Sequence, residues 1–145
     1  MNVDEQISRT LGCIHRGWRA YLARRLEPLG IGAGTAMFFM AIMNHEGSSQ
    51  EEIASFLLMD KTTTTRAIQK LVKGGYITRR RDPHDARVWR LFLSPAGRRL
   101  VPILRKERRH LATLLFKDFS DEEKNSFHAF LLRMANNLGS GDKKP

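Results

Sequence analysis

The fold of this chain is decided by residues 60–93, which read DKTTTTRAIQKLVKGGYITRRRDPHDARVWRLFL. Apolar side chains recur at helical spacing in the first part of this stretch, which predicts a helix from Lys61 to about Lys73. Asp60 is a favoured N-cap residue, and Gly74-Gly75 can take the positive φ that ends a helix. The buried face of this helix is expected to comprise Thr64 or Thr65, Ile68, Leu71 and Val72.

The second part of the stretch changes from helical to alternating spacing. Residues 76–81 and 88–93 are both strand-like. The polar segment 82–87 between them contains Pro83 and two aspartates, residue types that favour a reversal of the chain. The pattern therefore predicts a β-hairpin with a charged tip.

A short helix is expected immediately upstream. Ser49 with Glu52 has the spacing of a capping box, and Ser48 with Glu51 is the alternative register. Two short helices joined by a tight turn and followed by a basic hairpin form a winged helix-turn-helix, whose second helix enters the DNA major groove. We therefore expect residues 48–94 to be the DNA-binding part.

Longer amphipathic helices flank this part. A first helix is expected over residues 5–29, and a second should extend through Met43. Downstream, Ser94-Pro95 should begin a fifth helix, which Pro102 is expected to kink or delay. Ser120 and Glu123 should cap a sixth, with an apolar stripe of Phe127, Phe130, Leu131, Met134 and Leu138.

These elements predict a mainly α fold with a small β-wing, an α+β arrangement in a single domain over residues 1–145. Residues 5–29 and 95–138 are expected to be dimerisation helices, and residues 139–145 a disordered tail. The seam from Ile7 to Tyr21 and the sixth-helix stripe offer more apolar surface than a lone small domain needs. An intramolecular three-helix pack is the alternative.

The net charge of +10 is concentrated in one third of the chain. Residues 61–109 hold 15 of the 25 Lys and Arg and three acidic residues, a net charge of +12, so the remainder carries −2. Such clustering is typical of a surface that binds a polyanion. A solvated basic face that only aids solubility would have the same composition, so the pattern within the cluster has to distinguish the two.

The exposed face of the helix from Lys61 carries side chains suited to reading base edges. Arg can donate two hydrogen bonds to guanine, and Thr offers a hydroxyl and a methyl group to thymine. We expect Arg66 to be the main base reader beside Thr62 and Thr63, although helix capping is an equally good role for each of the threonines at 62–65. The expected DNA-binding residues are Thr62, Thr63, Arg66, Gln69, Lys70, Lys73, Arg79, Arg81, Arg87 and Arg90.

The hairpin tip carries a candidate minor-groove contact. Arg87 lies there, and narrow A·T tracts attract Arg. Asp85 is placed to pair with Arg87 and orient its guanidinium, but a surface salt bridge worth about 0–1 kcal/mol and without function is the alternative. The three arginines of residues 79–81 cannot all face one way on a strand, so one or two should flank the phosphates.

Three motifs carry a family resemblance: Leu71-x-x-Gly74-Gly75-Tyr76-Ile77-x-Arg79, Asp82-x-x-Asp85-x-Arg87 and Leu91-x-Leu93-Ser94-x-x-Gly97. Together they resemble the MarR family of bacterial and archaeal transcription regulators. Upstream, the run Trp18-Arg19-Ala20 followed by Arg25-Leu26-x-Pro28-Leu29 resembles its SlyA branch. The resemblance covers about residues 7–135.

The resemblance implies a homodimer in which the first, fifth and sixth helices interleave. It also implies a repressor that occupies a promoter palindrome and is often relieved by a small aromatic or phenolic ligand. By position, Arg66 matches the family's base-contacting arginine, and Asp85 with Arg87 matches its wing-tip pair. A candidate ligand cavity would be lined by Trp18, Tyr21, Met37, Phe38 and Met40, residues that could equally be plain core.

Cys13, the single cysteine, raises the alternative of a redox-sensing regulator, because some relatives sense oxidants through a cysteine in the first helix. Measured from Pro28-Leu29-Gly30-Ile31, however, Cys13 lies several residues too far along. The tyrosines that would partner it near the start of the second helix are also absent. A buried cysteine that behaves as a small hydrophobe is the commoner case.

The sequence also limits the function classes. The histidines have no i, i+4 pairing, so no metal or cofactor is expected, and no nucleophile–base or carboxylate pair suggests an enzyme. No apolar run reaches the roughly 18–20 residues of a membrane span, and the N-terminus lacks a signal-peptide pattern. We expect a cytoplasmic, nucleoid-associated regulator that binds double-stranded DNA. A non-specific architectural DNA-binding protein and a protein–protein module are the alternatives.

Overall fold

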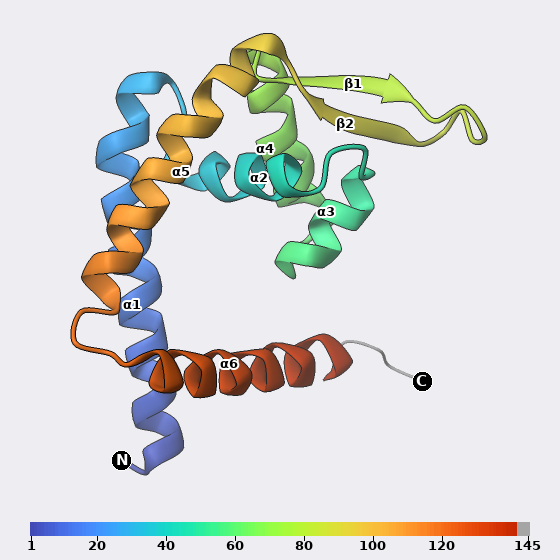
Figure 1. Ribbon diagram of the computed structural model, residues 1–145. Helices are drawn as coiled ribbons and strands as arrows, with labels where there is room; N and C mark the ends of the chain where they lie inside the picture. Colours follow the sequence, from blue (N-terminus) through green and yellow to red (C-terminus); the bar gives the residue numbers. More distant parts are fainter. Residues whose placement is uncertain (142–145) are drawn as a thin grey trace. The chain divides into compact units, whose positions relative to one another are not determined.

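The structure, a computed structural model, describes residues 1–141, with side chains up to residue 139. Its elements are α1 (Val3–Leu26), the 3-10 turn η1 (Glu27–Leu29), α2 (Ala33–Asn44), α3 (Gln50–Leu57), α4 (Lys61–Lys73), β1 (Ile77–Arg81), β2 (Trp89–Leu93), α5 (Pro95–Leu115) and α6 (Asp121–Gly141) (Figure 1). The chain forms two compact units, one from Met1 to Arg108 and one from Arg109 onward. The predicted mainly α fold with a small two-stranded sheet is confirmed.

The helix-turn-helix begins at a capping box, and the structure selects one of the two predicted registers. The Ser49 side chain accepts a hydrogen bond from the amide of Glu52, and the Glu52 carboxylate accepts one from the amide of Ser49. Asp60 caps α4 as predicted, since its carboxylate accepts from the amide of Thr63 at 2.8 Å. Only residues 58–60 separate the two helices, and Leu58 makes the sharp turn with a φ of 50°.

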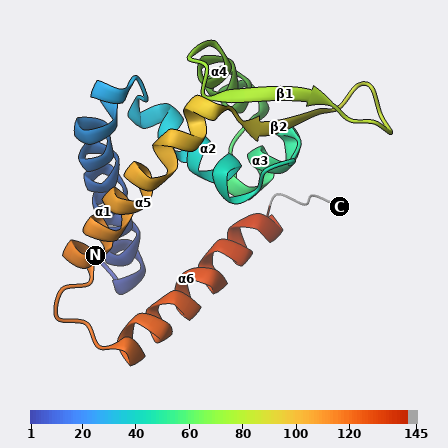
Figure 2. The same ribbon diagram turned by 45° about the horizontal axis from the view of Figure 1, so that its top comes forward.

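The hairpin pairs β1 with β2 in an antiparallel register that sets Ile77 opposite Leu93 and Arg81 opposite Trp89. An isolated bridge between Ser49 and Arg90 joins β2 to the segment before α3. In both views the base of the hairpin lies beside α2, α3 and α4, and its tip extends beyond them (Figures 1 and 2). The wing is therefore attached to the helices at its base and free at its tip.

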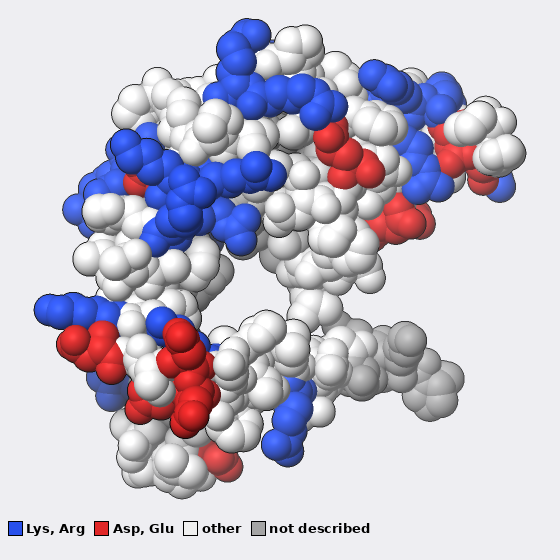
Figure 3. Space-filling view, viewed as in Figure 1, with Lys and Arg blue, Asp and Glu red and all other residues white. Residues whose placement is uncertain are grey.

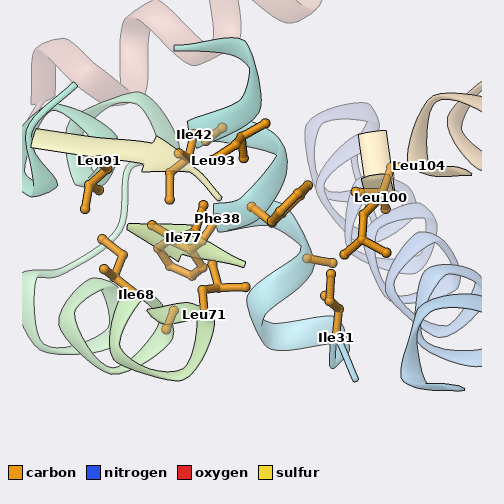
Figure 4. Close-up of a cluster of buried hydrophobic side chains, with 14 of the residues drawn as sticks. Ile31, Phe38, Ile42, Ile68, Leu71, Ile77, Leu91, Leu93, Leu100 and Leu104 are labelled. Carbon is orange, nitrogen blue, oxygen red and sulfur yellow. The ribbon is translucent and has the colours of Figure 1, made fainter. Parts of the chain in front are cut away.

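The core of the first unit lies where α2, α4 and the hairpin base meet. The side chains of Phe38 and Ile42 come from α2, and each is fully buried. Around them lie buried residues of α4, the hairpin and α5 (Figure 4): Ile68, Leu71, Ile77, Leu91, Leu93, Leu100 and Leu104. Burying one such side chain contributes roughly 1.5–3 kcal/mol, so this cluster fixes the hairpin base on α4.

Helix α5 begins at Pro95, as predicted from Ser94-Pro95, and continues through Pro102. Of the two effects expected of Pro102, a kink or a late start, the late start is therefore wrong. Ser94 caps the helix by accepting from the amide of Gly97 at 3.0 Å, and its own amide donates to the carbonyl of Tyr76 at 3.0 Å. The start of α5 is thus held directly against the start of β1.

In the second unit, α6 begins at the predicted capping box, in which Ser120 and Glu123 exchange side-chain and backbone hydrogen bonds. Phe116 lies edge-on to Phe119 and Phe127, with ring centroids 5.8 and 6.4 Å away. The helix extends to Gly141, so residues 139–141 of the expected tail are helical; residues 142–145 of that prediction lie outside the described residues.

Within residues 1–141, no single helix has the length and hydropathy needed to span a membrane. The segments Val3–Leu29 and Ala33–Asn44 reach those limits only when taken together, and they are bent by 85° with respect to each other.

Gly97 gives a test of this packing. A Cβ added to Gly97 would lie 2.2 Å from the carbonyl oxygen of Tyr76, a backbone atom that cannot move aside. We expect Gly97→Ala to lower the free energy of unfolding by about 1–3 kcal/mol in urea denaturation. Gly17→Ala is the control, because Gly17 is exposed in α1 with no atom within 4 Å of an added Cβ. Gly17→Ala should leave the free energy of unfolding unchanged or raise it. Equal losses of unfolding free energy in both variants would contradict the close approach of Gly97 to the Tyr76 carbonyl.

Candidate nucleic-acid interface

Helix α4 presents a polar, basic face away from the core. Its buried residues are Thr64, Ala67, Ile68 and Leu71. The exposed residues are Lys61, Thr62, Thr63, Arg66, Gln69, Lys70 and Lys73, which include all six that the sequence predicts to contact DNA from this helix. The structure therefore brings the predicted α4 residues together on one accessible surface.

The four threonines of α4 differ in burial and in the hydrogen bonds that their side chains make. Thr64 is fully buried and donates to the carbonyl of Asp60 at 2.8 Å, while the hydroxyl of Thr63 donates to the Asp60 carboxylate at 2.7 Å. Thr65 accepts from the side chain of Gln50 in α3. Thr62 is exposed. Thr63 and Thr64 therefore support the first turn of α4 together with its N-cap Asp60, and the side chains of Thr62 and Thr63 are exposed to solvent.

The hairpin separates its three consecutive arginines by face, as the alternation of a strand requires. Arg79 and Arg81 lie on the same face as the buried Ile77, and Arg80 lies on the other. Arg79 is half-buried, and its Nε is enclosed without a hydrogen-bond partner among the described residues. Arg81 donates to the carbonyl of Ala86 and lies 4.3 Å from the ring centroid of Trp89.

The predicted pair at the wing tip is present. The Arg87 guanidinium donates to both carboxylate oxygens of Asp85, with Nε–Oδ1 and Nη2–Oδ2 distances of 3.1 and 3.2 Å. The amide of Arg87 also donates to Asp85, at 3.0 Å. The Arg87 side chain is 90% exposed. Asp85 therefore orients a guanidinium that is almost entirely open to solvent.

A second carboxylate at the tip, that of Asp82, has a role that the sequence did not predict. Asp82 accepts from the amides of His84 and Asp85 at 2.7 and 3.0 Å, an Asx-type arrangement that its place at the start of a polar turn could have indicated. It also accepts from Arg90 Nε at 2.7 Å. Arg90 additionally donates to Glu52 of α3 at 3.0 Å. Arg90, predicted to contact DNA, is therefore bound to two carboxylates of its own chain.

Hydrogen bonds keep these acidic groups charged. The pKa of Asp85 is lowered mainly by the Arg87 guanidinium and then by the Arg87 amide. The pKa of Asp82 is lowered mainly by the His84 amide and then by Arg90, and that of Glu52 mainly by the Ser49 amide. Each lowered pKa contributes stability above the ordinary carboxyl pKa, and the contribution is lost as the pH falls through the lowered value.

Basic side chains dominate the accessible surface around these elements. Figure 3 shows Lys and Arg gathered along the hairpin and over the start of α5, with Asp and Glu between them toward the outer end of the hairpin. The exposed basic residues of α4 and the tip Arg87 belong to one winged unit. The arrangement suits a polyanion, because positive charge follows both a helix face and a protruding hairpin.

A largely apolar cavity of about 540 Å³ lies between α1, α2 and α3. Of the predicted ligand-cavity residues, Trp18, Met37 and Met40 line it. The prediction is wrong for two others, because Phe38 is fully buried in the core and Tyr21 does not border the cavity. The Tyr21 ring instead lies 3.7 Å below the guanidinium of Arg25. The polar residues of the cavity are His15, Arg19, Asn44, His45 and Arg108.

Cys13 is exposed rather than buried, which corrects the expectation that it is a small core residue. Its Sγ accepts a hydrogen bond from Arg16 Nη2 at 3.2 Å. In the part of the chain that the structure describes, no three His, Cys, Asp or Glu side chains are grouped so that they could hold a metal ion.

Comparison with known proteins agrees with this geometry. A sequence profile described as the MarR family matches residues 29–88, which include the helix-turn-helix, β1 and the turn of the hairpin but not β2. YybA of Bacillus subtilis, an uncharacterized HTH-type transcriptional regulator, is 30% identical over 132 residues, covering 91% of this chain and 88% of YybA. This chain belongs to the MarR family of transcriptional regulators. The predicted family resemblance is therefore confirmed.

Solved structures of MarR regulators superpose on nearly the whole chain. A MarR transcriptional regulator of Methanosarcina mazei is 35% identical, with a TM-score of 0.84 over 92% of this chain and 97% of its own. The regulator SlyA is 26% identical, with a TM-score of 0.88 over 93% and 95% of the two chains, in keeping with the SlyA-like motifs. A MarR family regulator of Listeria monocytogenes, crystallised with a 26mer DNA, is 25% identical, with a TM-score of 0.88 over 92% and 89%.

The pairing at the wing tip can be tested by carboxyl titration. Arg87→Ala should raise the pKa of Asp85 toward its ordinary value, because the largest cause of its lowering is removed. The pKa of Asp82 should stay low, since its bonds come from His84, Asp85 and Arg90. Carbon-detected NMR of the side-chain carboxyls across the acid range measures both. Arg80→Ala is the matched control, and an Asp85 pKa that does not change in Arg87→Ala would show that the pair does not form in solution.

Proposed function

We propose that this MarR regulator is a homodimeric repressor that occupies a promoter palindrome, with α4 reading bases in the major groove and the wing reaching the minor groove. The observation that carries the proposal is the exposed face of α4 around Arg66, in the same winged unit as an exposed Arg87 oriented by Asp85. The Listeria neighbour crystallised with DNA has the same fold and supports this assignment. Occupying a promoter would also place the protein at the nucleoid, in the cytoplasm.

Arg66 is the best-placed base reader on α4. It lies on the exposed face, one residue before the buried Ala67, in the N-terminal half of the helix that meets base edges in helix-turn-helix proteins. Thr62 and Gln69 are exposed beside it at helical spacing. Lys70 and Lys73 lie in the last turn, where a phosphate contact suits a flexible ammonium group.

The wing contributes a second contact of a different kind. The planar guanidinium of Arg87 is held in one orientation by both oxygens of Asp85, which lowers the entropy lost when it enters a groove. Arg79 is half-buried and its Nε is enclosed, so we assign contact with the DNA backbone to its terminal guanidinium nitrogens only. Arg81 is tied to Ala86 and Trp89 and contributes mainly positive charge.

Dimerisation is proposed because apolar side chains remain exposed on the helices outside the winged part. Helix α1 has 24 residues, of which Leu22 and Leu26 are buried, while Ile7, Ile14 and Trp18 are 45, 41 and 38% exposed. In the second unit, the apolar residues exposed on α6 are Phe127, Phe130, Leu132, Met134 and Leu138. A second copy would cover such surfaces and set two reading helices about 34 Å apart.

We also propose that the cavity beside α1 admits a small aromatic ligand that relieves repression. Its volume of about 540 Å³ is within the range of small-molecule sites, and Trp18, Met37 and Met40 give it an apolar wall. Phenol and benzoate are suitable probes, because they share a ring and differ in charge. Either probe should release bound DNA from the wild-type protein but not from Met40→Trp, in which the larger side chain fills the cavity. If neither probe affects DNA binding by the wild-type protein, the proposed ligand site is contradicted.

The proposed function is tested by binding to DNA from the protein's own promoter across a salt series. A repressor should bind a promoter site at least about 10³-fold more tightly than random DNA, with two protomers on each palindrome. Its affinity should fall steeply as salt rises, by roughly 0.9 logarithmic units per phosphate contact for each tenfold change in salt. Equal affinity for promoter and random DNA would overturn the proposed repressor function and favour a non-specific architectural DNA-binding protein.

Arg66→Ala tests the base-reading assignment. Loss of a bidentate contact should cost about 1–3 kcal/mol of discrimination between the promoter site and random DNA. Lys73→Ala is the matched control on the same helix face. It should weaken binding to the promoter site and to random DNA by the same factor, and it should lower the slope of log affinity against log salt concentration by about 0.9. Because both side chains are exposed, the free energy of unfolding should change little. Full discrimination by Arg66→Ala would assign base reading to another residue.

A further inference from the structure

Arg90 contacts the wing tip, the segment before α3 and α3 itself, and the backbone of Leu91 also bonds to Gly47 and Ser48. We propose that Arg90 is a positioning residue, which ties the wing tip to the N-terminus of α3 and thereby sets where Arg87 meets DNA, and that it makes no DNA contact of its own. The proposal rests on the DNA-binding function above and changes the role that the sequence predicts for Arg90.

The guanidinium of Arg90 makes three contacts to three separate parts of the chain. Its Nε donates to Asp82 at the tip at 2.7 Å, and its Nη1 donates to Glu52 of α3 at 3.0 Å. The same Nη1 lies 3.3 Å from the carbonyl oxygen of Gly47, which precedes α3. The Arg90 side chain is 33% exposed, whereas that of Arg87 is 90% exposed. Arg90 is therefore directed into its own fold.

Each of the two carboxylates that bind Arg90 also accepts hydrogen bonds from backbone amides. Asp82 accepts from the amides of His84 and Asp85, so it shapes the turn that presents Arg87. Glu52 accepts from the amide of Ser49 at 2.7 Å, so it belongs to the capping box that begins α3. Arg90 thus links the turn of the wing to the first turn of α3 through two ion pairs.

The charges favour this internal role over a phosphate contact. Asp82, Glu52 and Arg90 together carry a net charge of −1, and the lowered pKa of each carboxyl keeps both acids ionised at neutral pH. Such a cluster does not attract a phosphate, whereas Arg87 and Asp85 together are neutral and Arg87 projects outward. Arg80 and Arg90 are also direct cross-strand partners, a like-charge pair that is unfavourable unless other groups balance it.

The outer half of the hairpin needs such a link. Burial holds the base through Ile77, Leu91 and Leu93, but the strand residues nearest the tip, Arg81 and Trp89, are exposed. A two-stranded ribbon without a core beneath it is only marginally stable in water. Arg90 supplies polar contacts at the position where the apolar support ends.

The first test uses the free protein, so its outcome does not depend on DNA binding. Arg90→Gln should lower the NMR order parameters of the backbone amides of residues 84–87, because Asp82 loses its guanidinium partner. Glu52→Gln is a milder second variant: glutamine preserves a capping box but removes the ion pair, so the loss of order should be smaller. Arg98→Gln is the matched control, since Arg98 pairs with Glu46 and does not contact Asp82. Unchanged order in Arg90→Gln would overturn the proposal.

The second test is a double-mutant cycle on promoter DNA with Arg87→Ala. If Arg90 acts through Arg87, Arg90→Gln should weaken binding of the wild-type protein by no more than Arg87→Ala does, and should cause little further loss in the Arg87→Ala background. A direct phosphate contact would instead give additive losses and a salt slope lower by about 0.9 in both backgrounds. Additive losses would overturn the positioning role. Absence of any specific DNA binding would overturn the proposed function, and the order parameters would still decide the role of Arg90.

Discussion

The burial of one hairpin face against α2 and α4 is the constraint on which the rest of the winged unit depends. Ile77, Leu91 and Leu93 lie on that face and are almost fully enclosed, so a shift of register by one residue would turn all of them outward. The same packing fixes the rotation of α4, because Ile68 and Leu71 complete the cluster. The reading face of α4 and the direction of the wing are therefore two results of one packing arrangement.

Local sequence signals predicted the elements because their causes are local. The caps at Ser49, Asp60 and Ser94 depend on hydrogen bonds that span three or four residues, and each is present. The tip pair of Asp85 and Arg87 is also local and is present. The exposed face of α4 follows from helical spacing alone. The predicted fold and most of the candidate interface were thus contained in short stretches of the chain.

Contacts between distant residues explain what was missed. Arg90 is 38 residues from Glu52, and its basic side chain in a basic hairpin gave no sign of an internal partner. Helix α2 is apolar on most of its surface, so its spacing could not show that Phe38 faces the core while Met37 and Met40 face the cavity. Cys13 was expected to be buried on general grounds, and α1 leaves it exposed. Each case depends on a neighbouring element that the sequence does not identify.

The joint between the hairpin and α5 has a mechanical consequence. The Ser94 amide donates to the carbonyl of Tyr76, and the buried Gly97 packs against the same carbonyl group. The Ser94 hydroxyl donates to the carbonyl of Gly75. Backbone against backbone leaves no side chain that could rearrange to absorb a displacement. A rotation of the first turn of α5 would therefore be transmitted directly to the base of the wing through residues 94–97.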